Sequence, residues 1–158
     1  MSEFSITSPD FKEGEEIPKK FGYKFENVNP RLYFENIPKN TKSIALIMDD
    51  PDAMEAVGKV WVHWLACNIN YCITFTVKWT LTIRSNMDEN VGILGKTDFG
   101  ESCYGGPAPP DKRHTYIFKG YALDKELDLK EGYSKQDLEQ AMHGHILVEA
   151  KLTGTFTP

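Results

Sequence analysis

Val60 to Ile69 is the stretch that most constrains the fold, because it is the clearest candidate for a central strand. Side chains alternate between two faces in an extended chain. The alternation divides this stretch into Trp61, His63, Leu65, Cys67 and Ile69 on one face and Val62, Trp64, Ala66 and Asn68 on the other. Both faces are largely apolar, so we expect a strand that other elements cover on each side.

Four further segments carry strand signals. Ser43 to Met48 is a short apolar run, and residues 74–84 alternate between apolar side chains and threonine or charged ones, as in a half-buried strand. Tyr116 to Leu123 predicts another strand, and the alternating residues 146–152 predict the last one. Strands therefore dominate the chain.

One helix is well signalled near the C-terminal end. Ser134 is a suitable N-cap, Asp137 follows three residues later as in a capping box, and Gly144 suits the other end. Many strands with one clear helix indicate a mainly β protein. We predict a β-sandwich with Greek-key connections and one or a few short peripheral helices.

The composition indicates a single domain spanning residues 1–158. Apolar residues make up 41% and aromatic residues 12%, which is ordinary for a globular chain with a real core. No repeat, low-complexity tract or shift in composition marks a linker. The net charge of −5 argues against general nucleic-acid binding, which requires a basic surface.

Three features indicate a cytoplasmic protein. No stretch approaches the roughly 18 continuous apolar residues that span a bilayer, and no basic amphipathic helix stands out, so any membrane contact would be peripheral. The first residues lack the pattern of a secretory signal. The cysteines, Cys67, Cys72 and Cys103, are few, scattered and odd in number, which fits a reducing compartment.

Two acids in Asp50-Pro51-Asp52-Ala53 follow the strand that ends near Met48. Their side chains share a face if the chain stays extended through Pro51, but a proline here also suits the start of a turn. Taken alone, Asp50 is a common kind of residue for capping a strand end. A carboxylate close to a histidine would instead favour the protonated ring, which attracts phosphate.

Two histidines lie in strand-like surroundings. His63, within Trp61-Val62-His63-Trp64, is either a satisfied core residue or a polar donor held in an aromatic wall. His114 and Tyr116 project together if their strand begins by His114. Tyr116 is either an aromatic core residue or a hydroxyl donor to an anion.

A loop rich in glycine and proline, Tyr104-Gly105-Gly106-Pro107-Ala108-Pro109-Pro110, precedes His114. It is either a plain connector or a rigid binding loop. In the second interpretation, glycine lets backbone N–H groups approach an anion while proline fixes the shape of the loop.

Together these four motifs resemble the phosphatidylethanolamine-binding protein family, which includes the Raf kinase inhibitor proteins, and they match its small prokaryotic branch best. The resemblance covers most of the chain and implies a β fold with a shallow anion-binding pocket. Matched motif by motif, it implies a set of ligand-binding residues: Asp50, Asp52, Trp61, His63, Gly106, Pro107, His114 and Tyr116.

The chain departs from the family pattern in two places. Thr115 stands where the family usually has arginine, and the missing fixed cation bears on phosphate affinity, although Lys112 or Arg113 would partly substitute. Residues 70–90 replace a turn-rich connection with the alternating segment. That segment is either an extra edge strand that pairs with a second subunit or a local difference in the source sequence.

We interpret the chain as a non-enzymatic regulatory module that binds phosphate or a phosphoethanolamine-like headgroup. Histidine and tyrosine side chains would donate hydrogen bonds to the ligand, and the acids would hold the histidines in place. The resemblance adds a protein kinase or a protease as the candidate partner. A homodimer is the candidate assembly, because symmetric pairing of subunits is common. Neither a cofactor nor a bound metal is expected.

Two alternatives stay open. The first is a hydrolase or lyase in which His63 and His114 act as acid and base and Asp50 orients them, although no activated-nucleophile motif is present. The second is a partner-binding protein whose pocket is vestigial. A metal site at His143-Gly144-His145 is disfavoured because no further ligand completes it.

Overall fold

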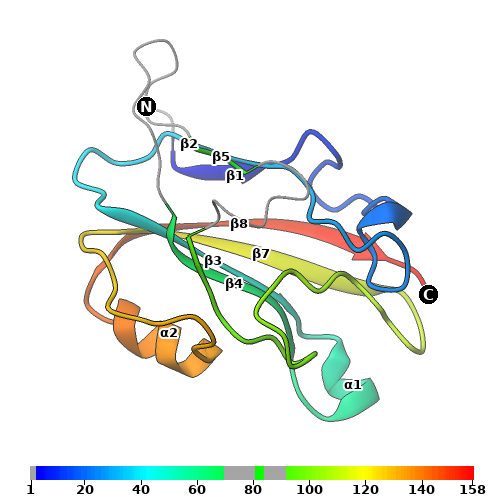
Figure 1. The fold of residues 1–158 in the computed structure, drawn as a ribbon. Helices are drawn as coiled ribbons and strands as arrows, with labels where there is room; N and C mark the ends of the chain where they lie inside the picture. Colours follow the sequence, from blue (N-terminus) through cyan, green and yellow to red (C-terminus); the bar gives the residue numbers. More distant parts are fainter. Residues whose placement is uncertain (1–2, 70–80, 84–91) are drawn as a thin grey trace.

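A computed structural model describes residues 3–69, 81–83 and 92–158, which form two antiparallel sheets and three short helical segments (Figure 1). The smaller sheet has the order β1-β2-β5, with β1 at Ser5–Thr7, β2 at Leu32–Glu35 and β5 at Leu81–Ile83. The larger sheet has the order β6-β4-β3-β7-β8, with β6 at Ile93–Leu94, β4 at Trp61–Ile69, β3 at Ser43–Asp50, β7 at His114–Leu123 and β8 at Ile146–Phe156. The helical segments are η1 at Lys19–Phe21, α1 at Ala53–Val57 and α2 at Lys135–Met142.

The larger sheet is covered on both faces, as its apolar central strand predicts (Figure 1). One face packs against the smaller sheet, where Phe34 joins Trp64 and Phe118 in a single buried cluster. The other face lies under α2, where Leu138 and Met142 cover a second cluster. Each fully buried side chain of this size contributes about 1.5–3 kcal/mol. The prediction of a mainly β sandwich with peripheral helices is confirmed.

Helix α2 begins and ends at the predicted residues. The Ser134 hydroxyl accepts a hydrogen bond from the Asp137 N–H at 3.0 Å, and the Ser134 N–H donates to the Asp137 carboxylate at 3.1 Å. Gly144 adopts a φ of +81° just beyond the helix, a conformation that glycine reaches without steric cost. Lys135 ties α2 to the sheet through an ion pair of 2.9 Å with buried Asp49.

Strand β4 departs from the strict alternation that its sequence predicts. Asp49 of β3 pairs with Val62, whereas its neighbour Met48 pairs with Trp64, so His63 is an extra residue on β4. A bulge of this kind re-aims side chains. As a result Val62 packs in the cluster under α2 while Trp64 packs between the sheets, although alternation would put both on one face.

Other predictions have mixed outcomes. The strand predicted at 43–48 continues to Asp50, the one predicted from Tyr116 begins at His114, and the last strand runs on to Phe156. The strand predicted over 74–84 lies outside the described residues, except for β5. Within the described ranges, no helix is long and apolar enough to cross a membrane.

Candidate ligand-binding site

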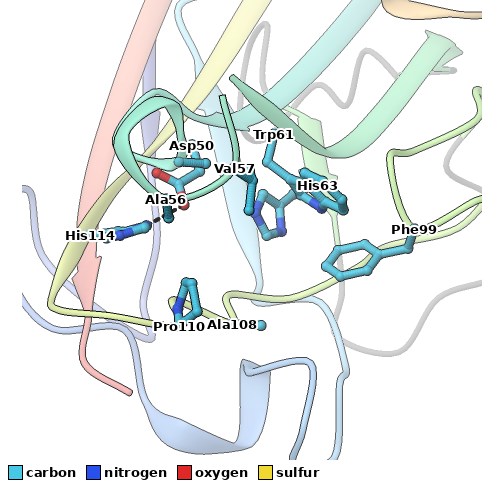
Figure 2. Close-up of a pocket in the computed structure, with 10 residues that line it drawn as sticks. Asp50, Ala56, Val57, Trp61, His63, Phe99, Ala108, Pro110 and His114 are labelled. Carbon is cyan, nitrogen blue, oxygen red and sulfur yellow. Dashed lines mark hydrogen bonds and ion pairs between the residues drawn. The ribbon is translucent and has the colours of Figure 1, made fainter. Parts of the chain in front are cut away.

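A cavity of about 220 Å³ opens where the end of β3, helix α1, the start of β4 and the loop before β7 meet (Figure 2). Four of the predicted residues line it: Asp50, Trp61, His63 and His114. Apolar side chains supply most of the remaining wall: Ala53, Ala56, Val57, Phe99, Ala108 and Pro110. The site is therefore a small, mainly apolar cavity with a few ionisable groups.

His114 lies between two carboxylates. Its Nδ1 is 2.7 Å from Asp50 Oδ2, and its Nε2 is 2.7 Å from Asp111 Oδ1 (the first contact is drawn in Figure 2). Burial by itself lowers the pKa of this fully buried imidazole, but the hydrogen bonds and charges of Asp50 and Asp111 outweigh it and raise the pKa above the ordinary value. Both ring nitrogens then donate, so His114 is an imidazolium whose two N–H groups are already paired with the carboxylates of Asp50 and Asp111.

His63 is held in the opposite protonation state. Its Nδ1 donates to the Gly105 carbonyl oxygen at 2.7 Å, since a carbonyl can only accept. Burial lowers the pKa of His63, and the hydrogen bond to Gly105 and the charge of Asp50 oppose this shift only in part. The neutral ring therefore carries its proton on Nδ1 and presents Nε2 as an acceptor.

Tyr116 lies close to both imidazoles without lining the cavity. Its ring centroid is 5.1 Å from that of His63, edge to face, and 6.4 Å from that of His114. The side chain is fully buried, and its hydroxyl lies near the Asp50 carboxylate and the Ala108 backbone without a well-aligned hydrogen bond to the described part of the chain. Burial, followed by the negative charge of Asp50, raises the pKa of this phenol, so the hydroxyl keeps its proton.

Asp52 does not join Asp50 in the cavity wall. The backbone turns after Pro51, so that the Asp52 N–H donates to Asp50 Oδ1 at 3.0 Å and Asp52 becomes the N-cap residue of α1. The Asp52 carboxylate instead accepts a hydrogen bond from the Thr115 N–H at 2.8 Å. The extended path that would have put both acids on one face is wrong, and Asp52 connects α1 to β7.

Gly106 and Pro107 shape the loop from behind the cavity. A Cβ at Gly106 would lie 2.0 Å from the Phe21 carbonyl oxygen, so glycine is required for contact with the η1 segment. The Gly106 N–H donates to Asn27 Oδ1 at 2.7 Å, and the Pro107 carbonyl accepts from the Tyr23 N–H at 3.0 Å. Pro107 lines a separate cavity of about 170 Å³, which shares Ala108 and Pro110 with the first.

Sequence reasoning missed several contributors. Asp111 precedes His114 by three residues, and that spacing in a loop was the available signal. Phe99 stacks on Tyr23 with centroids 4.0 Å apart and meets His63 edge to face. The three residues from α1 occur at positions i, i+3 and i+4, the spacing of one apolar helix face: Ala53, Ala56 and Val57.

Two basic side chains close in sequence to the cavity residues are paired with acids. Lys112 Nζ lies 2.5 Å from the Glu55 carboxylate, and Lys59 Nζ lies 2.6 Å from that of Asp98. Thr115 alternates with His114 and Tyr116 along β7, so its side chain leaves from the other face of the strand. Among the residues that line the cavity, His114 is the group that supplies positive charge.

Among the described residues, no group of three or more His, Cys, Asp or Glu side chains is arranged to hold a metal ion. His145, which belonged to the disfavoured metal motif, places its Nδ1 2.9 Å from Asp124 Oδ1.

Comparison with known proteins agrees with the fold and the motifs. The family described as phosphatidylethanolamine-binding protein matches residues 7–157. A UPF0098 protein of Chlamydia muridarum is 39% identical over 156 residues, which cover 96% of this chain and 97% of that protein.

The crystal structure of a putative phosphatidylethanolamine-binding protein homologue, CT736, from Chlamydia trachomatis superposes with a TM-score of 0.86 at 33% identity and covers 98% of this chain and 97% of that one. YbcL of E. coli gives a TM-score of 0.82 at 27% identity, with 98% of both chains covered. The chain therefore belongs to the phosphatidylethanolamine-binding protein family.

Proposed function

We propose that this chain is a non-enzymatic binding protein whose cavity takes a small phosphorylated headgroup together with a proton or an ammonium group. The observation that carries the proposal is the convergence of Asp50, His63 and His114, from three strands, on one cavity. The volume of about 220 Å³ is below the range of drug-sized sites, roughly 300–1,000 Å³, and so favours a ligand of the size of phosphate or phosphoethanolamine.

The charges restrict the form of the ligand. Asp50 and Asp111 together carry two negative charges and the His114 imidazolium carries one positive charge, so the cluster is net negative. A bare dianion would be repelled. A phosphate monoanion brings a hydrogen that His63 Nε2 can accept, and the ammonium group of phosphoethanolamine could pair with Asp50.

The adjacent Tyr116 hydroxyl is the donor best suited to a phosphoryl oxygen. It is buried near the Asp50 carboxylate and the Ala108 backbone without a well-aligned hydrogen bond to the described residues, and a ligand that reached it would satisfy it. We expect Tyr116→Phe to weaken phosphate binding about fivefold, the effect of losing one hydrogen bond of about 1 kcal/mol. The variant should fold, which thermal unfolding would check, because it removes only the hydroxyl and keeps the buried aromatic ring. An unchanged affinity would exclude the hydroxyl as a ligand contact.

The regulatory part of the proposal concerns the rim of the cavity. Met54 and Val57 of α1 are about half exposed, and Val57 also lines the cavity. A kinase or protease that contacted this apolar rim would sense whether the cavity is occupied. Inhibition of the partner should then change when phosphoethanolamine is added.

An NMR titration of the histidine rings tests the proposal, first with inorganic phosphate and then with phosphoethanolamine. We expect saturable shifts at His63 and His114, stronger binding of phosphate at pH 6 than at pH 8, and loss of these shifts in His63→Ala. His145→Ala is the matched control, because its ring lies by Asp124 outside the cavity. Absence of shifts at millimolar ligand would favour a vestigial pocket, and turnover of a phosphomonoester that His63→Ala abolishes would favour the hydrolase.

A further inference from the structure

Strand β8 is the outermost strand of the larger sheet, and its two halves have different neighbours (Figure 1). Its C-terminal half is covered by residues 14–17: the Gly14 N–H donates to the Thr153 carbonyl, and the Thr155 N–H donates to the Glu15 carbonyl, both at 2.9 Å. In the described part of the chain, no backbone hydrogen bond reaches the outer side of residues 147–151. This half is an open edge.

The register identifies which peptide groups face outward along that edge. Thr153 and Thr155 direct their N–H and carbonyl groups away from β7, and outward-facing residues recur every second position of an antiparallel ladder. The pairing of β7 with β8 runs without a shift from Phe156 back to Val148. Lys151 and Glu149 are therefore the next two residues with outward-facing peptide groups.

We propose that this edge pairs antiparallel with the same edge of a second copy of the chain, about a two-fold axis at Ala150. Glu149 of each copy then lies opposite Lys151 of the other. Each of these pairs exchanges two backbone hydrogen bonds and places opposite charges in direct cross-strand contact. The larger sheet continues through both copies. The proposal does not depend on the function of the cavity.

The charges of the edge residues favour this register over the two registers in which the two-fold axis is shifted by one residue. A two-fold axis at Glu149 would oppose two glutamates, and an axis at Lys151 would oppose two lysines, both of which are destabilising. The ladder is limited beyond Lys151, because the Thr153 N–H is already bonded to the Glu13 carboxylate at 2.9 Å. At the other end, Ile146 and Leu147 are 43% and 41% exposed and supply apolar surface for the contact.

The opposing interpretation is that Glu149 and Lys151 protect a monomer, since charged residues often blunt an exposed edge. Charge reversal separates the two interpretations. In E149K both edge positions carry lysine, and in K151E both carry glutamate, so each variant alone opposes like charges. An equimolar mixture of the two variants restores opposite charges in both pairs.

Analytical ultracentrifugation of the full chain, from micromolar to near-millimolar concentration, tests the proposal. We expect a concentration-dependent dimer for the wild type, dimerisation at least about tenfold weaker for each single variant, and recovery in the mixture. Lys130→Glu and Glu126→Lys make the same charge changes at exposed sites off the edge and should leave the dimer intact. Thermal unfolding of every variant confirms that it is folded.

Three results would overturn the proposal: a wild-type chain that stays monomeric over this range, a dimer that E149K and K151E leave as tight as before, or a mixture that fails to recover. The variant His63→Ala should dimerise like the wild type. A dimer that required an intact cavity would place the interface elsewhere.

Discussion

His63 and His114 both lie close to the Tyr116 ring and face one cavity, and both are almost completely buried. Burial lowers the pKa of either imidazole. His63 has a carbonyl as its partner and a lowered pKa, whereas His114 has two carboxylates and a raised one. The two histidines differ in their partners, and the two carboxylates beside His114 favour its charged form in a way that the single carbonyl beside His63 does not.

Removing Asp50 should disturb this contrast most. Asp50→Ala leaves the His114 imidazolium buried with only the more exposed Asp111 as its partner, and it also removes the acceptor for the Asp52 N–H. Breaking a buried pair in this way costs about 3–5 kcal/mol, which urea unfolding at neutral pH would measure. The exposed Asp128→Ala is the control and should stay within about 0.5 kcal/mol of the wild type. A loss below about 1 kcal/mol would mean that the pair is not a net stabilising contact.

The two histidines should give opposite pH dependences of stability. The folded pKa of His63 lies below the unfolded value of about 6.5, so its contribution is present above that pH and declines as the pH falls. The folded pKa of His114 lies above the unfolded value, so its contribution is complete below about pH 6.5 and is lost as the pH rises through the folded pKa. Each slope is at most about 1.4 kcal/mol per pH unit.

Urea unfolding between pH 5 and pH 8 would measure the free energy of unfolding of each histidine variant and of the wild type, and the difference between them gives the contribution of each histidine. His63→Gln should reduce the loss of stability on the acid side, and His114→Gln should reduce the loss on the alkaline side. Two variants that changed the same side of the profile would contradict the assignment of protonation states.

Asp111→Asn should have the smallest effect. Its carboxylate is 40% exposed, and water screens its charge more strongly than that of buried Asp50. We expect the His114 pKa to fall in this variant, but by less than in Asp50→Asn, while the titration of His63 stays unchanged. NMR titration of the ring protons would measure the His114 pKa in each variant and the titration of His63. An equal fall in both variants would show that exposure does not rank the two carboxylates.

The strands and four of the residues that line the cavity were predictable because they depend on local patterns. An apolar run located β3, alternation located β4, and the short motifs identified Asp50, His63 and His114, which line the cavity. The bulge at His63 was not predictable, since it depends on the pairing of β4 with β3 and not on either strand alone. Asp52 was grouped with Asp50 by sequence distance, but the turn at Pro51 separates their carboxylates.

The sequence by itself determined the family, the mainly β architecture, the capped helix α2 and the residue types available to the cavity, because periodicity, capping and motif spacing are properties of neighbouring residues. Only the tertiary structure decided that Asp111 holds His114, that Phe99 and α1 complete the wall, and that Gly106 makes room for the Phe21 carbonyl. Asp111 and His114 are close in sequence, but the other two outcomes depend on contacts between segments far apart in the chain. So do the contacts of His63 with Gly105 and of His114 with Asp50, which shift the pKa values of the two histidines. Desolvation and the position of a partner's charge exist only after the chain has folded.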